Sequence, residues 1–220
     1  MQNIPGWSLL KHCGGGVIQF ERQATKDQSL HRLTVINAHQ RPLEECLGVD
    51  LILHQSAYSS CTLIQYKRLK RYDDGWGFDL NDRQLEKQLE SISHFKNSRN
   101  THEVPSQIYD YRLGIESFFI KFCQNEVSDP HSKSLFKGWY VPASYLDLLK
   151  SDPSSMGPSG GRRLTEANVE RWFSNTEFFP LISSGWIGTC GDATRIIHDM
   201  INASLSGNRA LVFALSKAVQ

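Results

Sequence analysis

Apolar and β-branched residues gather in two neighbouring stretches of the chain, residues 49–54 and 62–69. Runs of this length and composition predict β-strands. The residues between them, 55–60, contain no apolar run and are expected to form a short polar loop. We therefore expect a pair of strands around which the rest of the chain is organised. Other apolar runs that predict strands lie at 33–38, 117–123 and 210–215.

Helical spacing of apolar residues is clearest over residues 82–95, where one face would be lined by Leu85, Leu89, Ile92 and Phe95. Asn81 is the expected N-cap of this helix. Weaker patterns of the same kind predict helices at 17–30, 144–150, 165–173 and 192–205. The Asp- and Gly-rich segment 71–82 predicts a loop, and the Ser-, Pro- and Gly-rich segment 151–161 predicts a flexible connection.

Composition narrows the class of protein. The 40% apolar and 21% charged residues are typical of a folded, soluble chain, and the net charge of +1 gives no overall field that would attract nucleic acid. The five cysteines include no CxxC pair, which argues against a disulfide framework and against a structural zinc site. No apolar run has the length of a membrane span, and the first residues lack the features of a secretory signal. A cytoplasmic protein without membrane contact is expected.

Three polar residues occupy matching positions on the two central strands. Asp50 opens the first strand, and Gln65 and Lys67 lie near the end of the second. Because side chains alternate across a strand, Gln65 and Lys67 point to the same face. We expect a carboxylate, an amide oxygen and an ammonium group to converge at one end of the sheet. Such oxygens suit Mg²⁺, and a lysine beside them can stabilise the transition state of phosphodiester cleavage.

The pattern formed by Asp50, Gln65 and Lys67 resembles the PD-(D/E)xK nuclease superfamily. It is most similar to the D…QxK variant found in Mrr-type restriction enzymes and in effector nucleases of bacterial anti-phage defence. The resemblance implies an α/β, restriction-endonuclease-like fold with a mixed central sheet flanked by helices. The predicted order helix, strand, strand, strand, helix, strand over residues 17–123 matches that core. Residues 1–125 would form the nuclease core and 126–220 a C-terminal α/β extension packed on it, or the two would form one continuous domain.

The same resemblance implies a DNA endonuclease that depends on Mg²⁺ or Mn²⁺ and acts in anti-phage defence with a partner ATPase or sensor. Asp50, Gln65 and Lys67 would be the catalytic residues. The metal ligands would be Asp50, Gln65, the carbonyl of Tyr66 and a second acid, Glu21, on the predicted first helix. Glu44 and Glu45 lie nearer to Asp50 in sequence and are the alternative acids, or simply exposed turn residues. The glutamine departs from the commoner acidic residue at this position.

Contacts with DNA would come from a local basic patch and one aromatic residue, namely Lys67, Arg68, Lys70, Arg71 and Trp76. Two alternatives remain open from the sequence. The first alternative is a catalytically degenerate nuclease fold that serves as a nucleic-acid-binding or interaction subunit. The second is a Holliday-junction resolvase. The resolvase alternative predicts a homodimer. Cys190, Asp192 and His198 do not indicate a thiol protease, because the short helical segment that carries them orients no catalytic pair.

Overall fold

The computed structural model of the 220-residue chain describes residues 4, 7–23, 30–39, 41–97, 105, 107–114, 116–124, 137–157 and 160–208. Within these residues the fold is mixed α/β, with a large, mostly antiparallel sheet flanked by helices. The predicted strand at 210–215 lies outside the described residues. None of the helices in the described ranges is both long and apolar enough to cross a lipid bilayer.

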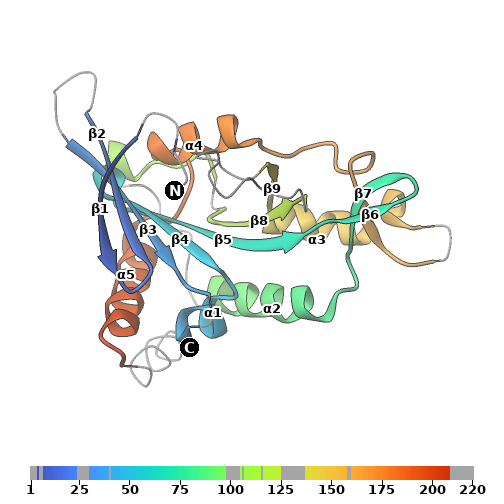
Figure 1. The fold of residues 1–220 in the computed structure, drawn as a ribbon, viewed down its shortest axis with the longest axis horizontal. Helices are drawn as coiled ribbons and strands as arrows, with labels where there is room; N and C mark the ends of the chain where they lie inside the picture. The colour runs from blue at the N-terminus through green and yellow to red at the C-terminus, as the bar shows by residue number, and fades with distance from the viewer. Residues whose placement is uncertain are drawn as a thin grey trace.

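The main sheet has seven strands and runs through the centre of the molecule (Figure 1). The strands in chain order are β1 (Ser8–Gly14), β2 (Val17–Gln23), β3 (Leu30–Asn37), β4 (Leu51–Gln55), β5 (Ser60–Arg68), β8 (Phe118–Cys123) and β9 (Gly138–Pro142). They lie side by side in this order. All neighbours pair antiparallel except β5 and β8, which run parallel. The predicted central pair of strands, β4 and β5, is therefore confirmed.

Helices cover both faces of this sheet. They are α1 (Pro42–Leu47), α2 (Arg83–Asn97), α3 (Ala143–Ser151), α4 (Asn175–Ser183) and α5 (Gly191–Leu205). Buried residues of α1, α2, α3 and α5 join one apolar cluster with Ile52 and Leu63 of the sheet. Those of α4 join the opposite cluster with Leu53 and Ile64. β9 is an edge strand of the main sheet, and α5 packs on the sheet in the same apolar cluster as Ile52 and Leu63. The segment after residue 126 therefore contributes to the common core.

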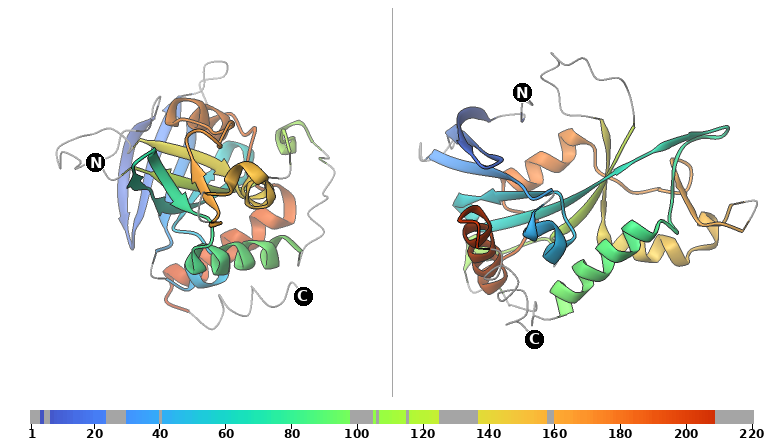
Figure 2. Two further views of the ribbon diagram at one scale, coloured as in Figure 1. Left: turned by 90° about the vertical axis from the view of Figure 1, so that its right-hand side faces the viewer. Right: turned by 60° about the horizontal axis from the view of Figure 1, so that its bottom comes forward.

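A second, smaller sheet overturns two predictions. It consists of β6 (Lys70–Tyr72), β7 (Gly75–Asp79) and β10 (Arg163–Thr165), in the order β10-β7-β6. The segment 71–82, predicted as a loop, thus forms a hairpin, which projects beyond the end of the main sheet (Figure 2). The predicted helix at 165–173 is wrong as well, because Leu164 is fully buried against this hairpin and Thr165 ends a strand. The turn after it is closed by the Thr165 amide, which donates to Asn168 Oδ1 at 2.7 Å.

The predicted helix at 17–30 is also wrong in its described part, because residues 17–23 form β2. The glycines at 14–16 all adopt positive φ and turn β1 back onto β2. Val17 and Phe20 are buried three residues apart, which imitates one face of a helix. On the strand they point to opposite faces, since Val17 belongs to one apolar cluster and Phe20 to the other. When both faces of a strand are buried, its sequence does not show the alternation of apolar and polar residues that would predict a strand.

The remaining helix predictions hold with small shifts. The helix predicted over 82–95 is α2, and its first amides are capped by Asp82, whose Oδ1 accepts from Leu85 N at 2.7 Å, instead of by Asn81. The helices predicted at 144–150 and 192–205 are α3 and α5. The strand predicted at 117–123 is β8. These segments have a single buried face or a fully buried run, and both patterns are legible in sequence.

Candidate functional site

The central site forms where β5 extends past the end of β4. The pair Leu51 and Ile64 is the last of the ladder, and the amide of Asp50 still donates to the carbonyl of Ile64 at 2.9 Å. Alternate residues of an antiparallel strand face the same neighbour, so Tyr66 points its N–H and C=O toward the edge that β4 has left. The Asp50 carboxylate fills this position and accepts from Tyr66 N at 2.8 Å through Oδ2. Asp50 thus continues the sheet with a side chain.

Gln65 lies against the same carboxylate. Its Nε2 donates to Asp50 Oδ2 at 2.5 Å and to the carbonyl of Tyr66 at 3.1 Å. The side chain is only 3% exposed, and its Oε1 has no hydrogen-bond partner among the described residues. The structure therefore brings Asp50 and Gln65 together as the sequence predicted, with the amide nitrogen between two oxygens.

Lys67 follows on the same face of β5 and is 8% exposed. Its Nζ lies 3.6 Å from Oδ1 of Asp82, the residue that caps α2. Burial lowers the pKa of the Lys67 ammonium, while Asp82, and more weakly Asp50, act in the opposite direction. The Lys67 ammonium is therefore held by Asp82 at the start of α2, through a contact that the sequence analysis missed.

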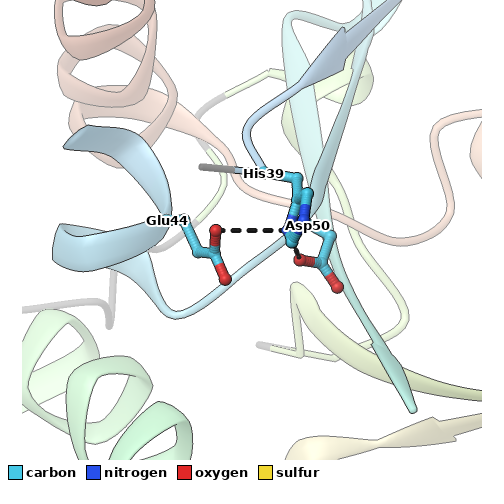
Figure 3. A group of neighbouring side chains, drawn as sticks. All are labelled: His39, Glu44 and Asp50. Atoms are coloured by element: carbon cyan, nitrogen blue, oxygen red, sulfur yellow. Dashed lines mark hydrogen bonds and ion pairs between the residues drawn. The ribbon is translucent and has the colours of Figure 1, made fainter. Parts of the chain in front are cut away.

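The second oxygen of Asp50 contacts a histidine, which also contacts another acid, as Figure 3 shows. His39 Nδ1 lies 3.1 Å from Asp50 Oδ1 and 3.3 Å from Glu44 Oε2. One ligand atom from each of the three residues falls within 4.8 Å of the others. His39 is on the turn after β3, Glu44 is in the first turn of α1, and Asp50 follows that helix. Glu44 is thus a second acid at the site.

The tight exit from α1 explains why these three residues meet. Gly48 adopts a left-handed φ of 67° and its amide donates back to the Glu44 carbonyl at 2.8 Å. A Cβ at Gly48 would lie 2.6 Å from the carbonyl oxygen of Gln88 in α2, so the chain turns here in a space that only glycine fits. The turn returns the chain to β4 with Asp50 beside the start of the helix.

Glu21 is not part of this site, and its prediction as a metal ligand on a helix is wrong. It lies on β2, where it pairs with Arg32 of β3. The next residue of β3, Leu33, pairs with Gln55 at the far end of β4. Glu21 is therefore level with the end of β4 that is opposite to Asp50, and two strands away. The position of the missing helix is taken by the β1–β2 hairpin.

The predicted DNA-contacting residues lie along the strand that leaves the site. Arg68, Lys70 and Arg71 are exposed, and they continue from β5 into β6. The Arg71 guanidinium stands 5.6 Å from the centre of the Trp76 ring, which is itself partly buried against the core. A role of these residues in nucleic-acid binding stays a prediction.

A buried cation on the other face of the sheet escaped the sequence analysis. Lys121 of β8 is 2% exposed, and its Nζ donates to Asn175 Oδ1 at 3.2 Å and lies 4.7 Å from the centre of the Tyr140 ring. Burial lowers the pKa of this ammonium to about 8. The available signal was a lysine inside the apolar run 117–123 that predicts this strand.

No family model, no curated protein and no solved structure matches this chain. The contacts around Asp50 are therefore the basis on which its function is inferred.

Proposed function

We propose that this protein is a metal-dependent DNA endonuclease whose reaction centre is Asp50. The observation that carries the proposal is the contact of the Asp50 carboxylate with Gln65 and with the Tyr66 backbone, with Lys67 on the same face of β5. The order β3, β4, β5, α2, β8, with β8 parallel to β5, supports a restriction-endonuclease-like core for this part of the chain.

The oxygens at this position fit a hard divalent cation. The Gln65 amide nitrogen touches Asp50 Oδ2 and the Tyr66 carbonyl, and rotation of the amide about its last torsion exchanges that nitrogen with Oε1. Three oxygens would then surround one point, an arrangement that a cation such as Mg²⁺ stabilises. The present orientation leaves Oε1 without a partner among the described residues, so no hydrogen bond of Oε1 opposes the rotation.

In this mechanism Asp50, Gln65 and the Tyr66 carbonyl would hold the ion. When bound, it supplies a Lewis acid and an activated water for attack on phosphorus. The Lys67 ammonium, which is paired with Asp82, would hydrogen-bond the attacking water or a non-bridging phosphate oxygen that carries growing negative charge. Glu44 adds the second negative charge that Gln65 does not provide.

Binding of DNA would begin on the hairpin of β6 and β7. Arg68 at the end of β5 and the hairpin residues Lys70 and Arg71 follow Lys67 in sequence and are exposed, so phosphates bound there would lie next to the reaction centre. Phosphate contacts of this kind give affinity without sequence preference. A role as an effector of bacterial anti-phage defence, working with an ATPase or sensor, belongs to the same proposal and is supported by the resemblance of the Asp50, Gln65 and Lys67 pattern.

One observation favours a second candidate, a nucleic-acid-binding subunit without catalysis. Asp50 Oδ2 already accepts two hydrogen bonds, from Gln65 and from Tyr66, and the carboxylate closes the step between two strands. These contacts are also those of a structural cap on the edge of β5. In that case the basic hairpin would bind nucleic acid and Asp50 would contribute only to stability.

Plasmid nicking over a titration of Mg²⁺ and Mn²⁺ separates the two candidates. Asp50→Asn keeps an oxygen that can accept from Tyr66 N but removes the charge, and Lys67→Met keeps the length of the side chain. Each should lower nicking by roughly a hundredfold or more, while Lys87→Met on the exposed face of α2 should not change it. The endonuclease assignment fails if folded wild-type protein does not nick, or if both site variants nick as well as wild type.

A further inference from the structure

We infer that His39, Glu44 and the outer oxygen of Asp50 form a second divalent-cation site, which takes a transition-metal ion such as Mn²⁺ in preference to Mg²⁺. The inference rests on the proposed function in that Asp50 is shared by both ions. It goes beyond that function because neither His39 nor the kind of metal follows from the nuclease proposal.

The spacing of the three ligand atoms fits one ion. His39 Nδ1 is 3.1 Å from Asp50 Oδ1 and 3.3 Å from Glu44 Oε2, and all three atoms lie within 4.8 Å of one another. Nitrogen and oxygen ligands at about 2.0–2.2 Å from a metal are separated from each other by roughly 3–3.5 Å. A small movement of Glu44 would complete such a set.

Charge at this position points in the same direction. Nδ1 of His39 faces two carboxylate oxygens, yet an imidazole nitrogen carries at most one hydrogen. One hydrogen cannot serve both acids in good geometry. A divalent cation in its place would contact both oxygens and the imidazole nitrogen at once, and would neutralise the two carboxylates.

Gln65 provides an independent observation. Its amide and the Tyr66 amide both donate to Oδ2 of Asp50, which fixes the carboxylate and directs Oδ1 to His39. The Gln65 Oε1 beside this carboxylate is buried and has no partner among the described residues. In the metal-free state the polar centre around Asp50 therefore contains a buried acceptor without a partner among the described residues, which a cation bound at Asp50, directly or through a water, would satisfy.

The three ligands are also held in place by the backbone around α1. The His39 amide donates to Asn37 Oδ1 at 3.0 Å, and the Ala38 amide donates to the Asp50 carbonyl at 2.7 Å. The side chains of Glu44 and Asp50 are 20% and 14% exposed, whereas that of His39 is 55% exposed. An ion can therefore enter from the His39 side and keep a coordination position for water there.

The imidazole decides the class of metal. Mg²⁺ prefers oxygen ligands and retains its waters, whereas first-row transition metals accept imidazole readily. A shared Asp50 carboxylate would place this ion next to the one held by Gln65 and Tyr66, in the manner of two-metal phosphodiesterase sites.

The test measures Mn²⁺ binding to the full chain in the absence of nucleic acid. Binding is monitored by the decrease of the free-Mn²⁺ signal in electron paramagnetic resonance. Pulsed spectra should show coupling of bound Mn²⁺ to an imidazole nitrogen. His39→Ala should remove this coupling and weaken Mn²⁺ binding by about tenfold or more, with little change for Mg²⁺. Glu44→Gln should also weaken Mn²⁺ binding. The matched controls are His12→Ala on exposed β1 and Glu45→Gln on the same helix as Glu44.

Two results would overturn the inference: wild-type protein without nitrogen coupling on bound Mn²⁺, or His39→Ala that retains both the coupling and the affinity. The wild-type spectrum decides alone if His39→Ala does not fold. The nicking assay gives a separate answer. If the protein binds Mn²⁺ through His39 but never nicks DNA, the second metal site stands and the proposed function is wrong. If the protein nicks DNA in a way that depends on Asp50, but His39→Ala binds Mn²⁺ like wild type, the proposed function stands and the second metal site is wrong.

Discussion

The amide nitrogen of Gln65 lies 2.5 Å from Oδ2 of Asp50, so a neutral side chain contacts the carboxylate at the point where a second acid would stand in a more acidic metal site. The contact is made by residues fifteen positions apart on neighbouring elements. It determines what substitutions at residue 65 should do.

Gln65→Glu should place two carboxylates in contact and make the stability of the protein depend on metal. Without metal, we expect a loss of roughly 1–3 kcal/mol in the free energy of unfolding, because a donor is removed and like charges meet. Mg²⁺ should restore this stability and sustain nicking at lower concentrations than in wild type. Urea unfolding with and without Mg²⁺, together with nicking, measures both effects.

Gln65→Ala should lose most of the nicking activity, because it removes the side-chain oxygen proposed to bind the metal. A Gln65→Ala variant that nicks like wild type would show that Gln65 is not a metal ligand.

Neutralising two residues of the basic patch formed by Arg68, Lys70 and Arg71, as in the double variant Arg68→Gln with Arg71→Gln, should weaken DNA binding equally for all sequences. Each lost phosphate contact should reduce the slope of log affinity against log salt by about 0.9. Fluorescence anisotropy over a salt series measures the slope. The control pair is Lys11→Gln with Lys87→Gln, two exposed lysines away from the hairpin. An unchanged slope in the hairpin variant would show that this patch faces away from DNA.

His54 predicts a loss of stability in mild acid. Its ring on β4 meets that of His198 on α5 with centroids 4.8 Å apart, and burial, followed by His198, lowers the pKa of His54 to about 4 from its ordinary value of 6.5. The unfolded chain therefore binds more protons between these two values, so stability is lost as pH falls from about 6.5 to 4. After allowance for the partly exposed ring, the loss should be about 2 kcal/mol. Urea unfolding at pH 7 and pH 4.5 should show a smaller difference for His54→Gln than for wild type.

Lys121 predicts a gain of stability on removal of its charge. A buried ammonium with an amide partner and aromatic neighbours is held at a cost, which the lowered pKa of about 8 reflects. Lys121→Met keeps most of the volume and should raise the free energy of unfolding at pH 7 by about 1–3 kcal/mol, since lost cation–π contacts offset only part of the gain. The difference from wild type should shrink between pH 8 and 10.5, where the unfolded chain binds the additional proton. A variant less stable than wild type at pH 7 would mean that the ammonium is net stabilising.

The central strands and α2 could be predicted because their patterns are simple. β4 and β5 are apolar runs, and α2 has one buried stripe made by Leu85, Leu89, Ile92 and Phe95. β2 could not, since Val17 and Phe20 are buried on opposite faces at a spacing of three, which reads as a helix. The β6–β7 hairpin was hidden by its Asp and Gly residues, which do form the turn at 73–74 but are flanked by short strands.

Part of the candidate site could be predicted from the same simple sequence patterns. Asp50 and Gln65 meet because a strand period and a hairpin are local properties. The prediction of Glu21 as a metal ligand was wrong because the helix predicted around it is the strand β2. His39, Glu44 and Asp82 reach the site through turns and a cap, whose geometry depends on Gly48 packing against Gln88 and on the start of α2. Such positions follow from tertiary contacts that no periodicity encodes.

The residues around Asp50 all come from one uninterrupted part of the chain, from His39 to Asp82. The loops that must close to bring them together are short, so little chain entropy opposes their meeting. The parallel partner β8 and the covering helix α5 arrive from far along the sequence. We therefore expect the segment that carries the site to gain structure early in refolding, before the distant elements dock. A metal ion present at that stage would bind the forming β4–β5 segment around Asp50 and speed its folding. The refolding rate in the presence of metal therefore reports on the site without any substrate.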